Sequence, residues 1–146
     1  MNLGQAYTAN GQLDLASAAY DSSLRLNPAS AEAHFCLANI RRRQKMPDKA
    51  IEHFSEAVRL EPTFVSAHVG LGMMLFNSQR YDDAADHFRA ALRIEPRLPP
   101  VHYALARIMV GAKRIDEAIV HLEEAVRLQP DNAEFKQALL ELRQKK

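Results

Sequence analysis

The 146-residue chain carries 19 lysine and arginine residues against 18 aspartate and glutamate residues, so its net charge gives no electrostatic reason to bind nucleic acid or a membrane surface. Almost half of the residues are apolar (47%), but only 7% are aromatic and tryptophan is absent, a composition that suits close-packed helices better than a sheet. The longest apolar runs are far too short to cross a bilayer, so we expect no membrane span.

Cysteine usage and the N-terminal sequence bear on the cellular compartment. Cys36 is the only cysteine, which excludes an internal disulfide framework. The N-terminus lacks the charged and apolar regions of a signal peptide. Both features favour a reducing compartment, such as the cytoplasm.

Prolines recur at a spacing of 34 residues, and the phrase before each proline recurs with it: Leu24–Pro28, Val58–Pro62, Leu92–Pro96 and Val126–Pro130. A fixed period of this length is typical of one supersecondary unit that is copied and stacked. The period predicts a single array over residues 1–146. Its parts are an incomplete unit 1–30, the full units 31–64, 65–98 and 99–132, and a capping helix in 133–146.

Each unit contains two blocks of helical periodicity separated by a polar break. In the unit 65–98, separations of three, four and seven put each apolar set on one face of a helix. The first set is Val65, His68, Leu71, Gly72 and Leu75, and the second is Ala84, Ala85, Phe88, Ala91 and Leu92. In chain order, the breaks fall at Asn10–Gly11, Gln44–Lys45, Ser78–Gln79 and Ala112–Lys113. Because proline cannot lie inside a helix, each unit is predicted to be an antiparallel helix pair ended by its proline.

Small residues recur at equivalent positions of both helices. They are Gly4, Ala38, Gly72 and Ala106 in the first helices, and Ala16, Ala50, Ala84 and Ala118 in the second. A larger side chain follows four residues after each of the latter, namely Tyr20, Phe54, Phe88 and Leu122. We predict that the helices approach most closely at the small residues and that the larger side chains fill the space beside them.

The array resembles a tetratricopeptide repeat (TPR) protein. Leu3-Gly4-Gln5-Ala6-Tyr7 is similar to the Leu-Gly-x-x-Tyr core of that family, and Leu71-Gly72 repeats its first half. The resemblance covers essentially the whole chain. It implies an all-α fold: a right-handed α-solenoid of stacked antiparallel helix pairs, with four TPR units, the first truncated, and a C-terminal capping helix. Histidines stand where the family often has tryptophan, and three of the four inter-helix turns lack glycine.

Acidic pairs are the nearest approach to a catalytic motif. Asp82–Asp83 and Asp116–Glu117 fall where second helices begin, so we interpret them as partners of the helix dipole. Asp131–Asn132 is likewise predicted to cap the last helix. Neither a glycine-rich phosphate loop nor a Cys-x-x-Cys or Gly-x-Ser-x-Gly motif occurs. We therefore predict no enzymatic activity, no catalytic residue and no cofactor.

The six histidines fall in register, with His34, His68 and His102 in first helices and His53, His87 and His121 in second helices. Zinc requires nitrogens about 2.1 Å from one ion. Helices of adjacent units are separated by about 8–10 Å, and we expect the two histidines of one unit to be offset by about one helical turn. The sequence therefore predicts planar packing groups and no metal site.

The resemblance also implies a binding face, because in TPR proteins the first helices line a concave groove. Carried onto this sequence, the groove residues are Phe35, Asn39, Arg42, Arg43, Val69, Met73, Phe76, Asn77, Tyr103 and Arg107. The implied function is a non-enzymatic protein–protein interaction module or scaffold that holds a partner peptide or helix. Its apolar side chains would serve as anchors and its arginines would pair acidic groups. Burial of some of these side chains by neighbouring units stays an open alternative.

Two other functions stay open at this stage. The N-terminal face has no polar cap, so the chain could be an assembly element that forms a homo-oligomer through that face. Alternatively, it could be the targeting region of a larger enzyme with its catalytic domain upstream. Neither the chaperone-type carboxylate clamp nor the glycosyltransferase-type asparagine ladder is formed by the residues at its positions, so the resemblance disfavours these two specialisations.

Overall fold

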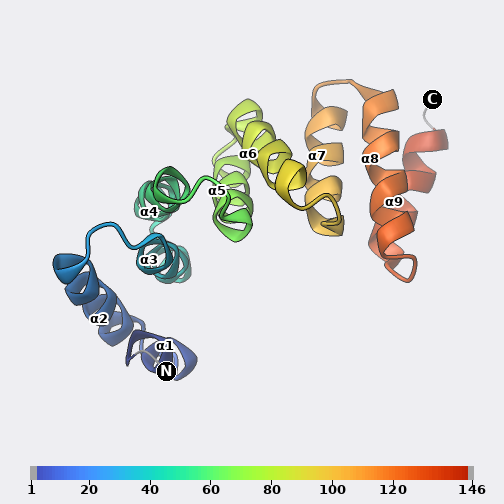
Figure 1. Cartoon of the computed structure of the whole chain (residues 1–146). Coiled ribbons are helices and arrows are strands. Elements are labelled where there is room, and N and C mark those ends of the chain that lie inside the picture. The colour runs from blue at the N-terminus through green and yellow to red at the C-terminus, as the bar shows by residue number, and fades with distance from the viewer. Residues whose placement is uncertain (1–2, 145–146) are drawn as a thin grey trace.

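The computed structural model describes residues 3–144, in which helices are joined by short turns and loops (Figure 1). The helices are α1 (Leu3–Ala9), α2 (Leu13–Leu26), α3 (Ala31–Arg43), α4 (Pro47–Leu60), α5 (Val65–Asn77), α6 (Tyr81–Ile94), α7 (Pro99–Gly111), α8 (Ile115–Leu128) and α9 (Ala133–Gln144). Successive helices pack as hairpins, and the hairpins follow one another along an arc from the N-terminus to the C-terminus (Figure 1). The predicted all-α solenoid of stacked helix pairs is confirmed.

The proline period marks the ends of the second helices. The residue before each proline is the C-cap of α2, α4, α6 or α8, and its backbone N–H still donates to a carbonyl four residues earlier. Proline lacks an N–H, and it disfavours helical geometry in the residue before it. The helix therefore stops at the same place in every unit.

Helix starts combine proline, capping side chains and acidic first turns. Pro47 and Pro99 open α4 and α7, where a missing N–H costs nothing. The Asn132 side chain accepts a hydrogen bond of 3.1 Å from the N–H of Phe135, and Ser30 caps α3 in the same manner. The acidic pairs lie in the first turns of α6 and α8, as the sequence predicts.

The turns inside the hairpins use a left-handed residue. Lys45, Gln79 and Lys113 have φ values of 59°, 62° and 59°, and Gly11 has 73° at the corresponding turn. Left-handed backbone costs a non-glycine residue about 1–2 kcal/mol. The tightness of the turn overrides this cost at three positions where the sequence has a long polar side chain in place of glycine.

Close approach of helices explains the small residues. Ala84 and Phe88 are completely buried, and a Cβ atom at Gly72 would lie 2.6 Å from the ring of Phe88. A second close approach joins successive units, because a Cβ atom at Gly70 would lie 2.5 Å from the ring of Phe54. The first contact confirms the predicted pairing of small and large residues within a unit, while the second was not expected from the repeat pattern.

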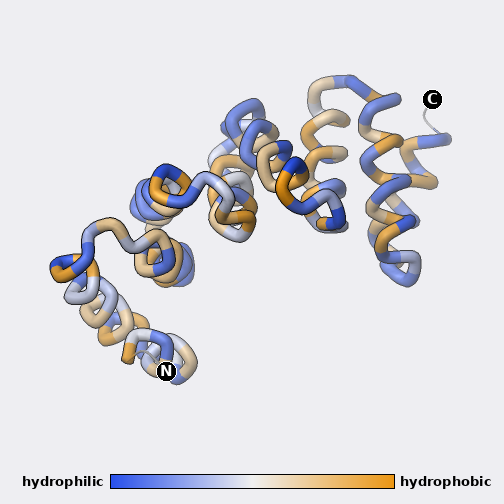
Figure 2. The backbone as a smooth tube through the Cα atoms, in the orientation of Figure 1, coloured by the Kyte–Doolittle hydropathy of each residue, from blue (hydrophilic) through white to orange (hydrophobic). Residues whose placement is uncertain are grey.

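Apolar and polar residues alternate along most of the helices, so that these present a buried and a wet side (Figure 2). Within residues 3–144, no helix combines the length and the apolar character needed to cross a membrane. The backbones of α6 and α7 approach each other at fewer places than those of the other successive helices.

Candidate peptide-binding face

Phe35 on α3 is part of an aromatic cluster. Its ring centre lies 4.9 Å from that of Phe64 and 5.8 Å from that of Phe54, and the side chain is half-buried. Phe54 is a core residue of α4. Phe35 therefore lies partly against the core and partly at the surface of the first helices, so only part of its ring is available to a partner.

The arginine cluster at the end of α3 is divided between two surroundings. Arg42 donates a hydrogen bond of 3.2 Å to the Asn39 side chain, and Arg43 donates one of 3.3 Å to the carbonyl of Thr8. Both guanidinium groups are exposed. Arg41 turns away from them and lies 3.7 Å from the carboxylate of Asp21 on α2. Two cations of the cluster therefore stay accessible, while the third is largely buried beside an acidic side chain of the first unit.

Arg107 on α7 has an aromatic setting. Its guanidinium carbon lies 4.8 Å from the ring centre of Phe76 on α5 and 6.0 Å from that of Tyr103, one turn earlier on α7. Phe76 also makes an edge contact of 5.4 Å with Tyr81 at the start of α6. A guanidinium over aromatic rings keeps its hydrogen-bond donors free while the rings fix its position. Within the part of the chain described, Arg107 contacts rings and makes no ion pair.

Tyr103 is anchored on its other side by α9. Its hydroxyl donates a hydrogen bond of 2.9 Å to Glu134, and its ring centre lies 5.0 Å from that of Phe135. Burial, and then the hydrogen bond to Glu134, raise the pKa of the Tyr103 hydroxyl. The aromatic rings of α5, α7 and α9 thus form one continuous strip with Arg107 in its middle.

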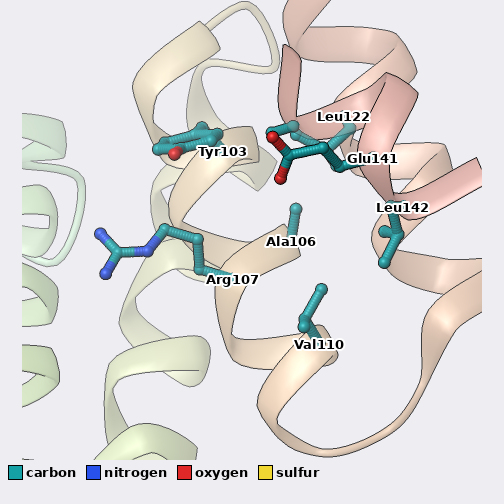
Figure 3. A pocket seen from close by; sticks show the side chains of 8 residues that line it. Tyr103, Ala106, Arg107, Val110, Leu122, Glu141 and Leu142 are labelled. Carbon is teal, nitrogen blue, oxygen red and sulfur yellow. The ribbon is translucent and has the colours of Figure 1, made fainter. Parts of the chain in front are cut away.

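A hollow lies on each side of Arg107. One, of about 440 Å³, occupies the sparse junction of α6 and α7 and is lined by Phe76, Tyr81, Asp82, Arg107, Ile108, Gly111 and Ala112. The other, of about 260 Å³, lies between α7 and α9 and is lined by Tyr103, Ala106, Arg107, Val110, Leu122, Ala138, Glu141 and Leu142. Figure 3 shows the Arg107 side chain extending away from Glu141, and Arg107 lines both hollows. We call this region the Arg107 strip: Phe76, Tyr103, Arg107 and the two hollows beside them.

The other candidate residues lie outside the Arg107 strip. Val69 is half-buried against the core, whereas Met73 is 43% exposed and Asn77 is exposed. The sequence pattern missed Tyr81 and Asp82, because they begin a second helix and reach the face only through the loose α6–α7 junction. No repeat position signals that junction.

The histidines depart from expectation. In each of the three full units, the histidine of the first helix contacts the histidine of the second helix directly. The two Nδ1 atoms are 3.1 Å apart in His34–His53 and His68–His87 and 3.2 Å apart in His102–His121. The predicted offset of one helical turn is therefore wrong. Residues 3–144 contain no group of three or more histidine, cysteine or acidic side chains gathered as metal ligands.

The fold and the face together define a class of protein, a helical-repeat solenoid with an aromatic and basic strip across its first helices. Family profiles described as tetratricopeptide repeat match residues 1–63, 41–99 and 75–142. The chain therefore belongs to the tetratricopeptide repeat family.

Solved structures agree with this assignment of the fold. The crystal structure of MamA superposes with a TM-score of 0.93 at 23% identity, over 99% of this chain and 85% of MamA. YrrB, described as a TPR protein with an unusual peptide-binding site, gives 0.82 at 21% identity, over 92% of this chain and 70% of YrrB. The Cut9–Hcn1 hetero-tetramer of the APC/C gives 0.82 at 24% identity, over 96% of this chain and 28% of the other. A search of the curated proteins finds no match.

Proposed function

We propose that this chain is a non-enzymatic interaction module that holds a peptide or helix of a protein partner across the Arg107 strip. Tetratricopeptide repeats generally serve protein–protein interaction, and one of the similar structures, YrrB, is described by its peptide-binding site. The observation that carries the proposal is the placing of an exposed, ring-stacked guanidinium between two hollows lined largely by apolar side chains.

The chemistry of the strip specifies the partner segment. Arg107 suits a carboxylate, because guanidinium and carboxylate form paired hydrogen bonds. The hollows beside it suit apolar side chains on either side of that carboxylate. Arg42 and Arg43 add positive charge toward the N-terminal units, while Glu134 and Glu141 add negative charge at the α9 end. A segment with an acidic residue between two apolar residues, and a basic residue toward α9, would match this pattern.

Panning a displayed peptide library on the folded chain would test the proposal. We expect the enriched peptides to carry an acidic residue flanked by apolar ones. Aromatic and arginine hot spots in interfaces contribute about 2 kcal/mol or more, so Arg107→Ala or Phe76→Ala should weaken binding of these peptides at least about 30-fold. Arg93→Ala, which removes the same charge from the last turn of α6, is the matched control and should bind as wild type does.

Equal binding of the enriched peptides to wild type and to the Phe76→Ala/Arg107→Ala double variant would refute the assignment of the site.

Self-association is the second candidate function, because α1 and α2 expose Leu3 and Leu15, which are 62% and 48% accessible. A molecular mass in light scattering that rises with concentration, and falls when both leucines are replaced by glutamine, would favour it.

A further inference from the structure

Three histidine pairs join the two helices of the second, third and fourth units. They link α3 to α4, α5 to α6 and α7 to α8, and each repeats the same contacts. In the central pair, the Nε2 atom of His68 also lies 3.0 Å from the carbonyl oxygen of Pro62. The equivalent distances to Pro28 and Pro96 are 3.3 and 3.0 Å.

The geometry is that of one proton shared between two rings. In each pair the ring centres lie 5.4 Å apart, which exceeds the nitrogen separation by about two ring radii, so both Nδ1 atoms lie near the line joining the centres. Such an end-on arrangement suits an N–H donating directly to a nitrogen lone pair. A metal ion about 2.1 Å from both nitrogens would lie well off both lone-pair axes. Hydrogen bonding is therefore the better account of the contact.

The proline carbonyl fixes the tautomer of both rings. A carbonyl oxygen only accepts, so His68 must donate from Nε2 to Pro62. In neutral His68 the Nδ1 atom is then the acceptor, and His87 must donate from its own Nδ1. The same reasoning assigns the Nε2–H form to His34 and His102, and the Nδ1–H form to His53 and His121.

One added proton is tolerated in this arrangement. If His68 is protonated, its Nδ1–H donates to His87, which carries its proton on Nε2 instead. A second proton leaves two N–H groups facing each other across 3.1 Å, with a positive charge on each ring and no acceptor between them.

We propose that the histidine pairs act as a pH-sensitive latch, repeated in three units, that holds each hairpin closed while the pair carries at most one extra proton and releases it when both rings are protonated. The latch goes beyond the proposed binding function and does not depend on it. Because the pairs repeat the same contacts, acid acts on all three hairpins in the same direction.

The surrounding charges do not remove the conflict between two protonated rings. The first pair has four charged neighbours: Asp21 of α2, Arg41 of α3, and Glu52 and Glu56 of α4. The second pair has Arg80, Asp83 and Asp86 as charged neighbours. The third pair has Arg89 of α6, and Glu117 and Glu124 of α8. The carboxylates favour a first proton on each pair, while the arginines oppose it. Among residues 3–144, the two Nδ1 atoms of each pair contact each other directly, with no acceptor between them.

The direction of the pH effect follows from burial. Burial, and then the neighbouring histidine, lower the pKa of His53, His87 and His121 below the ordinary value of 6.5. The unfolded chain therefore binds more protons than the folded chain at acid pH, and stability rises with pH. The loss of stability begins as pH falls below about 6.5 and continues down to the lowered pKa values of the folded state.

Two measurements test the latch. The first is nitrogen-15 NMR of the histidine rings in the wild-type chain at pH 7.5, which needs no variant. We expect Nε2–H tautomers at His34, His68 and His102, and Nδ1–H tautomers at His53, His87 and His121. Finding the latter three rings in the Nε2–H form would overturn the proton arrangement.

The second measurement is the urea midpoint between pH 7.5 and 5.5, a range above the titration of most carboxylates. If each of the three pairs takes up about one proton on unfolding, the unfolding equilibrium constant should rise by up to about a thousandfold for each unit by which the pH is lowered. The triple variant His53→Asn/His87→Asn/His121→Asn keeps a donor near each Nδ1 position and removes one titrating ring per pair, so its midpoint should change much less with pH. A variant whose midpoint follows pH as steeply as that of wild type would overturn the latch.

Discussion

Gly72 offers the sharpest test of how the hairpins pack. Substitution by alanine adds one Cβ atom at 2.6 Å from a ring carbon of Phe88, about 0.8 Å closer than ordinary van der Waals contact begins. The Phe88 ring is completely buried between α5 and α6, so it cannot swing into solvent. Forcing an extra carbon into such a core typically costs about 1–3 kcal/mol. For a chain of this size, we expect the melting temperature to fall by about 3–10 °C.

The matched control is Gly111→Ala at the end of α7. A Cβ atom there meets nothing within 4 Å, so the same substitution adds helix propensity without a clash. It should raise stability, by up to about 1 kcal/mol. Differential scanning calorimetry of both variants gives the comparison, and Phe88→Leu should recover part of the loss in the Gly72→Ala background. If the Gly72→Ala chain had the same melting temperature as wild type, α5 and α6 could not approach each other as closely as described.

Two further substitutions test the turns and the caps. Gln79→Gly should raise the melting temperature, with a gain of about 0.5–1 kcal/mol, because glycine adopts the left-handed backbone without strain; a lower melting temperature would contradict the φ of that turn. Asn132→Ala should cost about 1 kcal/mol by removing the hydrogen bond to the N–H of Phe135. Its effect should appear as faster amide exchange in the first turn of α9, and unchanged exchange there would speak against the cap.

The solenoid could be predicted from sequence because its determinants are local. The helix faces follow from the spacing of apolar residues, the helix ends follow from proline, and both signals occur in every unit. Asn132 and Pro47 also act within one turn of their own helix. Rules of this kind depend only on residues within one helix, so they apply without knowing which residues of the neighbouring helix it packs against.

The histidine contacts could not be predicted, because they depend on the register of two antiparallel helices. A pattern of faces tells which side of a helix is buried, but not how far one helix is displaced along the other. That displacement is fixed by the short turn and its left-handed residue, such as Gln79. The setting of Arg107 was hidden for a similar reason, since the ring beneath it, Phe76, belongs to the preceding unit.

The contact between Phe54 and Gly70 has a consequence for the order of the units. Phe54 belongs to the second unit and presses on the backbone of the third, where a side chain of even one carbon would collide with its ring. At the equivalent place the second and fourth units have Cys36 and Ala104. The units are therefore no longer interchangeable copies. Reordering or duplicating them to build a longer array would have to keep the α4–α5 junction intact, or else replace both of its residues together.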